Sequence, residues 1–223
     1  SEIQRYAVYY LPDDAGLAAF GASWLGWDAA TGTTCDQPQV PGIAAFTAAP
    51  RKYGFHGTLK PPFRLARGKT ADELAASVAA LAGRTPRVRL DGLQLQQMAK
   101  FLALVPKGDT APLDQLAFAC VRELDGYRHL PGEAELQRRR AVGLTARQDE
   151  LLLKWGYPYV AEEFRFHLTL TGRLEPAETE RVTAALSEFL PPLTGSFEIA
   201  SIALLGQDSD GMFRLIHRYA LTG

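Results

Sequence analysis

Two segments of the chain repeat one pair of polar residues at one spacing. In YGFHGTLKP, His56 precedes Thr58 by two positions, and in FRFHLTLTG, His167 precedes Thr169 in the same way. Polar and apolar residues alternate through both segments, which predicts strands with one buried face. Because side chains at positions i and i+2 of a strand share a face, each strand presents an imidazole beside a hydroxyl.

Paired imidazoles can move protons near neutral pH, because the pKa of a free histidine is about 6.5. Across one cleft, one ring would take a proton from water while the other gives a proton to a departing oxygen. Threonine hydroxyls would donate hydrogen bonds to the non-bridging oxygens of a phosphoryl group. His56, Thr58, His167 and Thr169 are therefore the predicted catalytic residues for opening a phosphodiester, especially a cyclic one, with no metal and no cofactor.

Three further polar residues continue the predicted polar faces and are expected to bind substrate: Lys60, Arg165 and Thr171. The two cations would neutralise phosphate charge. A histidine on a polar strand face is more often solvated or hydrogen-bonded than catalytic, so one H-x-T motif alone would indicate little. Its recurrence over the same apolar pattern favours the functional interpretation, because packing does not require both residue types to recur on an open face.

The segments HGTL at 56–59 and HLTL at 167–170 resemble the paired H-x-T-x signature of the two-histidine phosphoesterases. This LigT-like superfamily includes RNA 2',3'-cyclic phosphodiesterases and the bacterial RNA 2'-5' ligase. Six longer segments resemble one branch, the phosphonate-metabolism proteins associated with carbon-phosphorus lyase operons: RYAVYYLP, KYGFHGTLKPPFRLA, KFLALVP, ELQRRR, LLLKWGYPYV and FRFHLTLTG. The resemblance covers nearly the whole chain.

The resemblance implies an α+β fold of the duplicated, two-lobed LigT-like type, with antiparallel sheets lining a central cleft and helices on the outside. It also implies that the two histidines act as acid and base and that the two threonines hold the phosphate. We expect one domain over residues 1–223, with a first lobe at about 1–124, a helical insertion at about 125–160 and a second lobe at about 161–223. A chain of 223 residues with 47% apolar content is long enough for such a core.

Alternation predicts strands over residues 5–11, 53–61, 87–106 (as a pair), 164–172 and a C-terminal hairpin made by SFEIASIALLGQ and MFRLIHRYAL, with Pro61 and Pro62 ending the second strand. Helical periodicity and capping residues predict helices that begin at Asp13 or Asp14, Thr70, Pro112, Glu133, Thr145 and Pro176.

The predicted insertion carries two features with open interpretations. Arginines 138–140 end a short charged helix, either as solvated cations or as a phosphate clamp. The aromatic residues of the segment WGYPYV either wall the cleft or pack against the core. His129 and His217 are assigned no role.

Composition restricts the partners. The chain has 24 basic and 25 acidic residues, a balance that disfavours nucleic acid, whose binding depends on neutralising phosphates. A small phosphorylated metabolite fits better, and RNA is a possible but less favoured partner. Two cysteines and four histidines without ligand spacing make a metal site unexpected. No signal-like segment and no long apolar run is present, so we expect a cytoplasmic protein without a membrane partner.

The predicted function is a metal-independent cyclic phosphodiesterase acting on a small cyclic phosphate. The operon association of the resembling branch suggests ribose 5-phosphate 1,2-cyclic phosphate, released in phosphonate catabolism. Two alternatives stay open: an RNA 2',3'-cyclic phosphodiesterase or 2'-5' ligase-like enzyme, and a non-catalytic module that binds a nucleotide or sugar phosphate. Two titrating groups weigh against the binding module, because binding alone needs donors only. The sequence leaves open which histidine is the acid.

Overall fold

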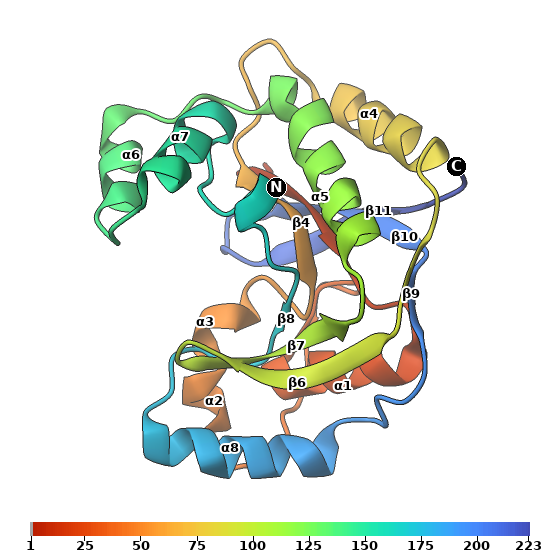
Figure 1. Ribbon diagram of the computed structural model, residues 1–223, viewed down its shortest axis with the longest axis vertical. Helices are drawn as coiled ribbons and strands as arrows, with labels where there is room; N and C mark the ends of the chain where they lie inside the picture. The colour runs from red at the N-terminus through yellow and green to blue at the C-terminus, as the bar shows by residue number, and fades with distance from the viewer. Residues whose placement is uncertain (1) are drawn as a thin grey trace.

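A computed structural model describes residues 2–223 and contains one seven-stranded sheet in the order β11-β10-β1-β4-β8-β7-β6 (Figure 1). Its strands, all paired antiparallel, are β1 (Arg5–Tyr10), β4 (Gly57–Phe63), β6 (Gly92–Met98), β7 (Phe101–Lys107), β8 (Leu168–Thr169), β10 (Ser201–Gln207) and β11 (Phe213–Ala220). Two small antiparallel sheets pair β2 (Trp27–Asp28) with β3 (Thr33–Thr34), and β5 (Val88–Leu90) with β9 (Phe197–Ile199).

The helices are α1 (Ala15–Leu25), α2 (Ile43–Phe46), α3 (Ala48–Arg51), α4 (Ala71–Gly83), α5 (Ala111–Glu123), α6 (Glu133–Arg140), α7 (Ala146–Trp155) and α8 (Pro176–Phe189). Two 3-10 turns, η1 (Asp125–Tyr127) and η2 (Ala161–Glu163), flank α6 and α7. The α+β class with an antiparallel sheet, expected from the sequence, is confirmed. Within residues 2–223, no helix is both long and apolar enough to cross a lipid bilayer.

Local sequence signals explain where the helices begin and end. The Thr70 hydroxyl accepts a hydrogen bond from the Glu73 amide, and the Glu73 carboxylate accepts one from the Thr70 amide. Thr145 and Gln148 form the same reciprocal box ahead of α7. Gly156 ends α7 with a φ of 79°, a left-handed conformation that a residue with a Cβ adopts at a cost. The predicted capping boxes are thereby confirmed.

The sheet interleaves distant parts of the chain. The N-terminal strand β1 pairs with β10, from the C-terminal hairpin, and with β4, the first motif strand. The last four residues of β1, 7–10, are almost fully inaccessible to solvent, so this strand needs covering layers on both faces and a neighbour on each side. As a result, the predicted lobes 1–124 and 161–223 contribute strands to one common sheet rather than to two sheets set apart along the sequence.

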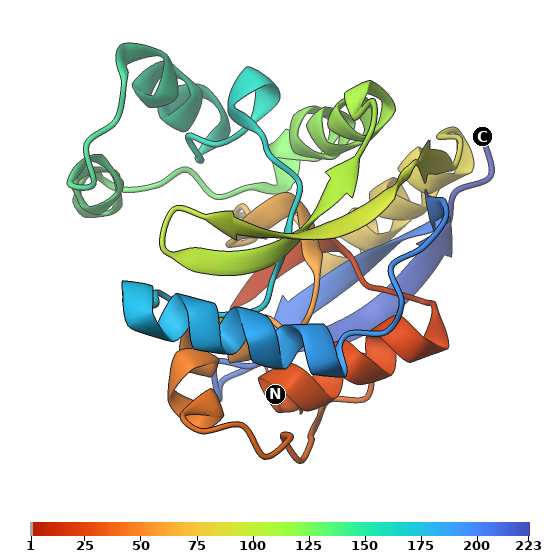
Figure 2. The ribbon, with the colours of Figure 1, turned by 60° about the horizontal axis from the view of Figure 1, so that its bottom comes forward.

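Helices cover the sheet at different places. Helix α4 contacts β10 and β11, α5 contacts β4, and α8 contacts β7. Helices α1 and α8 lie side by side (Figure 2), where the ring of Trp24 is 6.3 Å from that of Phe189. Helices α6 and α7 form a separate pair to one side of the sheet (Figure 1), within the predicted insertion. Helix α5 therefore covers the first motif strand, β4, while α4 packs at one end of the sheet and α8 toward the other.

The first motif strand departs from its predicted regular alternation. Tyr9 lies opposite Thr58, but the next residue of β1, Val8, lies opposite Lys60, so Leu59 is an extra residue in a β-bulge. A second register shift precedes Phe63. The prediction that Pro61 and Pro62 end this strand is wrong, because the irregular ladder admits residues that cannot donate a backbone hydrogen bond.

Candidate active site

The two motifs meet at the centre of the sheet. Strands β4 and β8 are antiparallel neighbours, with Gly57 directly opposite Leu168. Continuing this register places Thr58 opposite His167, and His56 opposite Thr169, so each histidine faces the threonine of the other motif. Side chains directly opposite one another in an antiparallel pair have Cβ atoms about 4.5–5.5 Å apart. The motifs are thus related by a local twofold arrangement about the Gly57–Leu168 pair.

Glycine at position 57 permits this close pairing. A Cβ on Gly57 would overlap the ring of Phe166, which fills the space on the face opposite the histidines. The Phe166 side chain is buried, as are Leu168 and Leu170 on the same face. The apolar face predicted for the second motif is therefore confirmed, and it presses that motif against β4.

Both imidazoles are oriented by the main chain in the same way. Nδ1 of His56 lies 2.9 Å from the carbonyl oxygen of Gly54, and Nδ1 of His167 lies 2.7 Å from that of Arg165. A carbonyl only accepts hydrogen bonds, so Nδ1 carries the proton in both rings and Nε2 is the nitrogen left for chemistry. The left-handed φ of Gly54, 77°, belongs to the turn that brings its carbonyl under the ring.

The environment of His56 favours its neutral form. Burial lowers the pKa of His56 to about 4; the hydrogen bond to Gly54 opposes this shift and the charge of His167 adds to it. The ring stacks on Tyr9 at a centroid distance of 3.7 Å. Its Nε2 lies 3.0 Å from the Thr58 hydroxyl, which donates to it. His56 is therefore a neutral, fixed proton acceptor at neutral pH.

His167 occupies a similar but less extreme environment. Burial lowers the pKa of His167, and the hydrogen bond to the Arg165 carbonyl opposes that shift. The ring of Phe101 lies 5.7 Å from its own, on the adjacent strand β7. Thr169 pairs with Ala103 of β7 and is half-buried, on the same face as His167 because the two residues are two positions apart.

Lys60 does not lie where the alternation predicted. The bulge at Leu59 turns its side chain to the opposite face, where it is 2% exposed. Its ammonium donates to the carbonyl oxygen of Val121 at 3.3 Å and lies 5.1 Å from the ring centroid of Phe63. Burial lowers the pKa of Lys60 to about 8, against the raising effect of Asp125. The expectation that Lys60 shares a polar face with His56 is therefore corrected.

Thr171 is also turned away from the predicted polar face. Its side chain is buried, its hydroxyl accepts from the Leu102 amide at 3.0 Å, and the same hydroxyl donates to the Gly172 carbonyl at 2.7 Å. The hydroxyl therefore takes the place of a backbone acceptor beside β7. Strand β8 spans two residues rather than the predicted 164–172, and these contacts correct the substrate-binding role expected for Thr171.

Arg165 lies at the rim of the site. Its Nη1 donates to the carbonyl oxygens of Phe164, at 2.7 Å, and Glu162, at 3.0 Å, and the side chain is exposed. These contacts cap the turn η2 just before His167. Arg165 thus borders the cleft, but its guanidinium already donates hydrogen bonds to two nearby backbone carbonyls.

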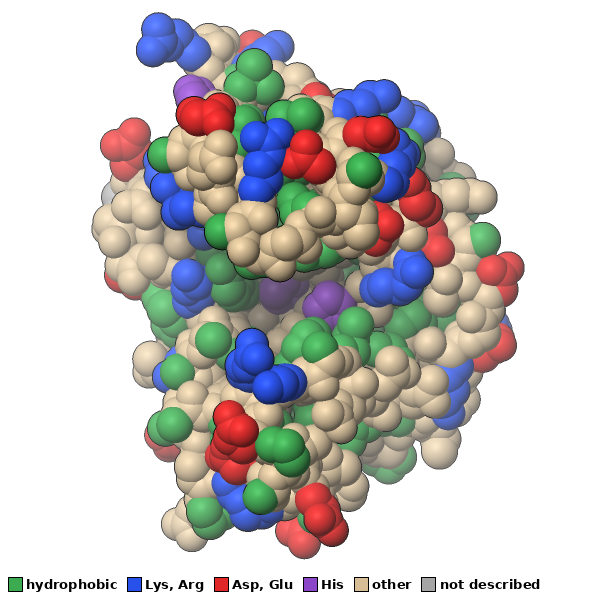
Figure 3. All heavy atoms as spheres, turned by 60° about the vertical axis from the view of Figure 1, so that its left-hand side comes forward, with side chains coloured by type: hydrophobic (Ala, Val, Ile, Leu, Met, Phe, Trp, Pro, Cys, Tyr) green, Lys and Arg blue, Asp and Glu red, His purple; other side chains and the backbone are tan. Residues whose placement is uncertain are grey.

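A cavity of about 420 Å³ opens beside the motifs and contains Thr58 and His167 in its lining. Its walls are largely apolar and include the aromatic residues Phe101, Phe118, Tyr157, Tyr159 and Phe164. Figure 3 shows histidine side chains in the hollow that crosses this face of the molecule. The placement of Tyr157 and Tyr159 beside the cleft, one of two interpretations from the sequence, is confirmed. Trp155 instead packs edge-on against Phe118.

Sequence patterns did not reveal the aromatic neighbours of the histidines. Tyr9 and Phe101 belong to apolar strands, RYAVYY and FLALVPK, where an aromatic residue ordinarily indicates core packing. Within residues 2–223, no group of three or more histidine, cysteine, aspartate or glutamate side chains is arranged to hold a metal ion.

The fold and the paired motifs define an α+β protein with two histidine–threonine pairs at the centre of an antiparallel sheet. A solved structure with a similar fold is TT0787 of Thermus thermophilus, 16% identical, with 98% of each chain covered and a TM-score of 0.51. LigT of E. coli, solved as a complex with NADP+, is 18% identical over 100% of both chains with a TM-score of 0.47.

The chain belongs to the family described as protein of unknown function DUF1045, whose model matches residues 58–214. Two similar proteins are both named ribose 1,5-bisphosphate phosphokinase PhnN. The protein from Janthinobacterium sp. (strain Marseille) is 41% identical over 182 residues, 79% of this chain and 40% of that protein. The protein from Laribacter hongkongensis (strain HLHK9) is 36% identical over 177 residues, 78% of this chain and 41% of that protein. This chain therefore spans about two fifths of the length of these relatives.

Proposed function

We propose that this chain hydrolyses a small cyclic phosphodiester without a metal ion, using two histidines as base and acid. The observation that carries the proposal is the meeting of both H-x-T pairs across β4 and β8, with each Nδ1 tied to a carbonyl. This arrangement directs two Nε2 atoms and two hydroxyls to one face. A phosphate between them would meet an imidazole and a hydroxyl from each strand.

In the proposed reaction, Nε2 of His56 removes a proton from water as the water oxygen forms a bond to phosphorus. The bond from phosphorus to one ring oxygen breaks in line, and Nε2–H of His167 gives its proton to that oxygen. We assign His56 as the base because its pKa is lowered to about 4, which keeps Nε2 free at neutral pH. The negative charge of the bound phosphodiester favours the protonated form of His167.

The threonines would stabilise the charge that develops on the phosphoryl oxygens. Thr58 and Thr169 carry neutral hydroxyls on the same face as the histidines, and hydroxyls fixed on strands lose little free energy to reorientation during the reaction. The Thr58 hydroxyl, which donates to His56, would rotate to a non-bridging oxygen when substrate enters.

The relatives' name suggests where the product goes. About three fifths of each relative lies outside the part similar to this chain. The Gly-Lys-Thr sequence of this chain, Gly68 to Thr70, has Phe63 where the phosphate-binding loop of many kinases has its first glycine, and Thr70 instead caps α4. We therefore attribute the kinase name to the remainder of those proteins.

The reaction proposed for this chain would form the molecule on which the remainder of the relatives is named to act. Ribose 5-phosphate 1,2-cyclic phosphate gives ribose 1,5-bisphosphate when water adds to phosphorus and the bond to O2 breaks. Ribose 1,5-bisphosphate is the molecule in the name of both relatives. We accordingly propose ribose 5-phosphate 1,2-cyclic phosphate as the substrate, with O2 as the leaving oxygen. This substrate is a small phosphorylated metabolite, in accord with the balanced charge of the chain.

The test is hydrolysis in EDTA of ribose 5-phosphate 1,2-cyclic phosphate beside nucleoside 2',3'-cyclic phosphates. We expect turnover of the sugar substrate to ribose 1,5-bisphosphate, identified by phosphorus NMR. His56→Gln and His167→Gln should each lower kcat by about 100- to 10,000-fold, the usual contribution of general acid–base catalysis. Preference for the nucleotides would place the chain in RNA end processing. Binding without turnover across the panel would favour a non-catalytic module.

A further inference from the structure

A second cavity, of about 460 Å³, lies on the other side of the aromatic wall of the candidate active site. Tyr157 and Tyr159 line both cavities, and their rings meet edge to face at 5.5 Å. Helix α6 supplies the opposite wall through Arg138 and Arg139, together with Glu135, whose carboxylate pairs with Arg139. Two cationic side chains are therefore separated from the catalytic cavity by the thickness of one tyrosine pair.

Arg139 is held in place but not fully satisfied. Its guanidinium carbon lies 5.4 Å from the ring centroid of Tyr157, and its Nη2 lies 3.5 Å from a Glu135 carboxylate oxygen. Its Nε is buried and has no hydrogen-bond partner. The side chain as a whole is 28% exposed, so the rest of its guanidinium remains accessible from the cavity.

The three consecutive arginines differ in what they contact. Arg140 is engaged with Asp149 of α7, with Nε at 2.6 Å and Nη2 at 3.3 Å from the two carboxylate oxygens. Arg138 is exposed and has no ion-pair or hydrogen-bond partner within residues 2–223. One arginine thus fixes α6 to α7, and its two neighbours are left to face the cavity.

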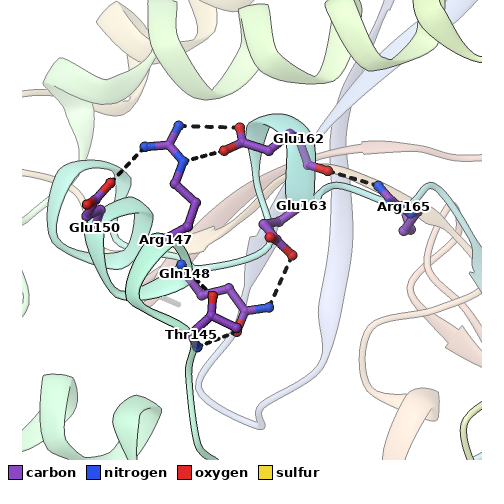
Figure 4. Close-up of polar contacts among 7 residues, drawn as sticks. All are labelled: Thr145, Arg147, Gln148, Glu150, Glu162, Glu163 and Arg165. Carbon is purple, nitrogen blue, oxygen red and sulfur yellow. Dashed lines mark hydrogen bonds and ion pairs between the residues drawn. The ribbon is translucent and has the colours of Figure 1, made fainter.

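A series of contacts ties helix α7 to the segment that precedes His167, and Figure 4 shows those between α7 and residues 162–165. Arg147 of α7 pairs with Glu150 at 3.1 Å and with both carboxylate oxygens of Glu162 in η2. Gln148 donates to the Glu163 carboxylate at 3.1 Å, and Arg165 donates to the Glu162 carbonyl. The carbonyl oxygen of Arg165 in turn accepts a hydrogen bond from Nδ1 of His167 and so orients the catalytic ring. The arginines therefore stand at a set position from the reacting centre.

We propose that Arg138 and Arg139 bind a second, non-reacting phosphate group of the substrate. A phosphate monoester offers several acceptor oxygens and up to two negative charges, which suits the partly exposed guanidinium of Arg139 and the exposed guanidinium of Arg138. The substrate class is therefore a cyclic phosphodiester that also carries a terminal phosphate. This assignment rests on the proposed function for the nature of the reacting group.

The kinetic test compares two cyclic substrates, ribose 5-phosphate 1,2-cyclic phosphate and ribose 1,2-cyclic phosphate without the 5-phosphate. Arg139→Gln should raise KM for the first about 10- to 100-fold, the range expected for losing charge-assisted hydrogen bonds, and leave kcat nearly unchanged. KM and kcat for ribose 1,2-cyclic phosphate should change less than about twofold, because this substrate has no terminal phosphate for the two arginines to bind. Arg138→Gln should act in the same direction and less strongly, since its side chain is exposed.

Each of two control variants removes one positive charge at a position outside the proposed phosphate site. Arg181→Gln lies on α8, away from α6 (Figure 1), and should leave KM for both substrates unchanged. Arg140→Gln breaks the contact between α6 and α7 and should lower thermal stability. Equal KM changes for both substrates in Arg139→Gln, or no change for either, would overturn the proposal.

Equilibrium binding separates this proposal from the proposed function. Calorimetry with ribose 5-phosphate, which has no cyclic group, should show binding to the wild type that weakens about 10-fold or more in Arg139→Gln. If ribose 5-phosphate binds in this way but no cyclic substrate is hydrolysed, the phosphate site would be upheld and the diesterase activity rejected. Hydrolysis of the sugar substrate together with binding that Arg139→Gln leaves intact would uphold the diesterase and reject the site.

Discussion

At the scale of single residues, the main-chain carbonyls of Gly54 and Arg165 determine the chemistry available to the histidines. Each carbonyl lies two residues before its histidine and fixes the proton on Nδ1. The same i−2 contact in both motifs gives two rings of the same tautomer, although their surroundings differ. Burial lowers the pKa of both rings, to about 4 for His56, and this supports the proposed assignment of His56 as the base.

The pH dependence of catalysis follows from these two pKa shifts. The base must be unprotonated, so kcat/KM should rise with pH through the pKa of His56, at about 4. The acid must be protonated, so kcat/KM should fall as pH rises through the pKa of His167, which burial places below the usual value of 6.5. We expect a bell-shaped profile with its maximum below pH 6.5. Initial rates across this range would measure it, and an optimum above neutrality would contradict the assignment.

The buried position of Lys60 predicts an effect on stability and not on substrate binding. Lys60→Met should leave KM for the bis-phosphorylated substrate within about twofold, because the ammonium bonds to the Val121 carbonyl on the other face. A tenfold rise in KM would show instead that this lysine reaches the substrate.

The stability of the same variant should depend on pH with a definite sign. Burial lowers the pKa of Lys60 from 10.5 to about 8, so between these values the unfolded chain binds more protons than the folded chain. Wild-type stability should therefore rise relative to Lys60→Met as pH increases from about 8 to about 10. Urea unfolding of both proteins at the two pH values measures the difference.

At the scale of secondary-structure elements, the pairing of β4 with β8 depends on Gly57. A methyl group there would overlap the ring of Phe166, which is itself buried and has little room to move. Gly57→Ala should lower the free energy of unfolding by about 1–3 kcal/mol, the usual cost of overpacking. It should also lower kcat, because the two motifs would separate.

Gly83→Ala is the matched control for that variant. A Cβ at Gly83, at the end of α4, has no atom within 4 Å and its φ is not left-handed. This substitution should leave activity unchanged and leave stability equal or slightly higher, since alanine favours a helix over glycine by up to about 1 kcal/mol. Equal behaviour of the two variants in chemical unfolding and in kcat would argue against the importance of the close pairing.

At the scale of the whole molecule, the charge balance predicts how activity responds to salt. With 24 basic and 25 acidic residues, the chain has no general attraction for a polyanion. The KM of a small substrate held by a few partly buried contacts should change by only about threefold between 50 and 300 mM salt. An RNA strand that used about six phosphate contacts would lose about a thousandfold in affinity over the same range. The RNA alternative would be favoured if an RNA substrate had a higher kcat/KM than the small cyclic substrate and its KM rose steeply with salt.

The chain by itself determined the local features of this protein, because these depend on residues close together in sequence. Capping boxes at Thr70 and Thr145 set helix starts, and the recurring H-x-T pair identified the polar face on which His56 and His167 lie. These signals are local: a cap needs three residues, and a strand face needs every second one. The α+β class was expected from the resemblance of the motif segments to the two-histidine phosphoesterases.

Only the tertiary structure decided which strands are neighbours and which polar side chains reach the cleft. The bulge at Leu59 arises from pairing with β1, and it sends Lys60 into the interior. Thr171 is occupied because its hydroxyl meets the Leu102 amide of β7. Hydrogen-bond ladders join residues far apart along the chain, so their register cannot be read from local alternation. For the same reason, the approach of Arg139 to the wall of the candidate active site depends on contacts between helices rather than on the sequence around it.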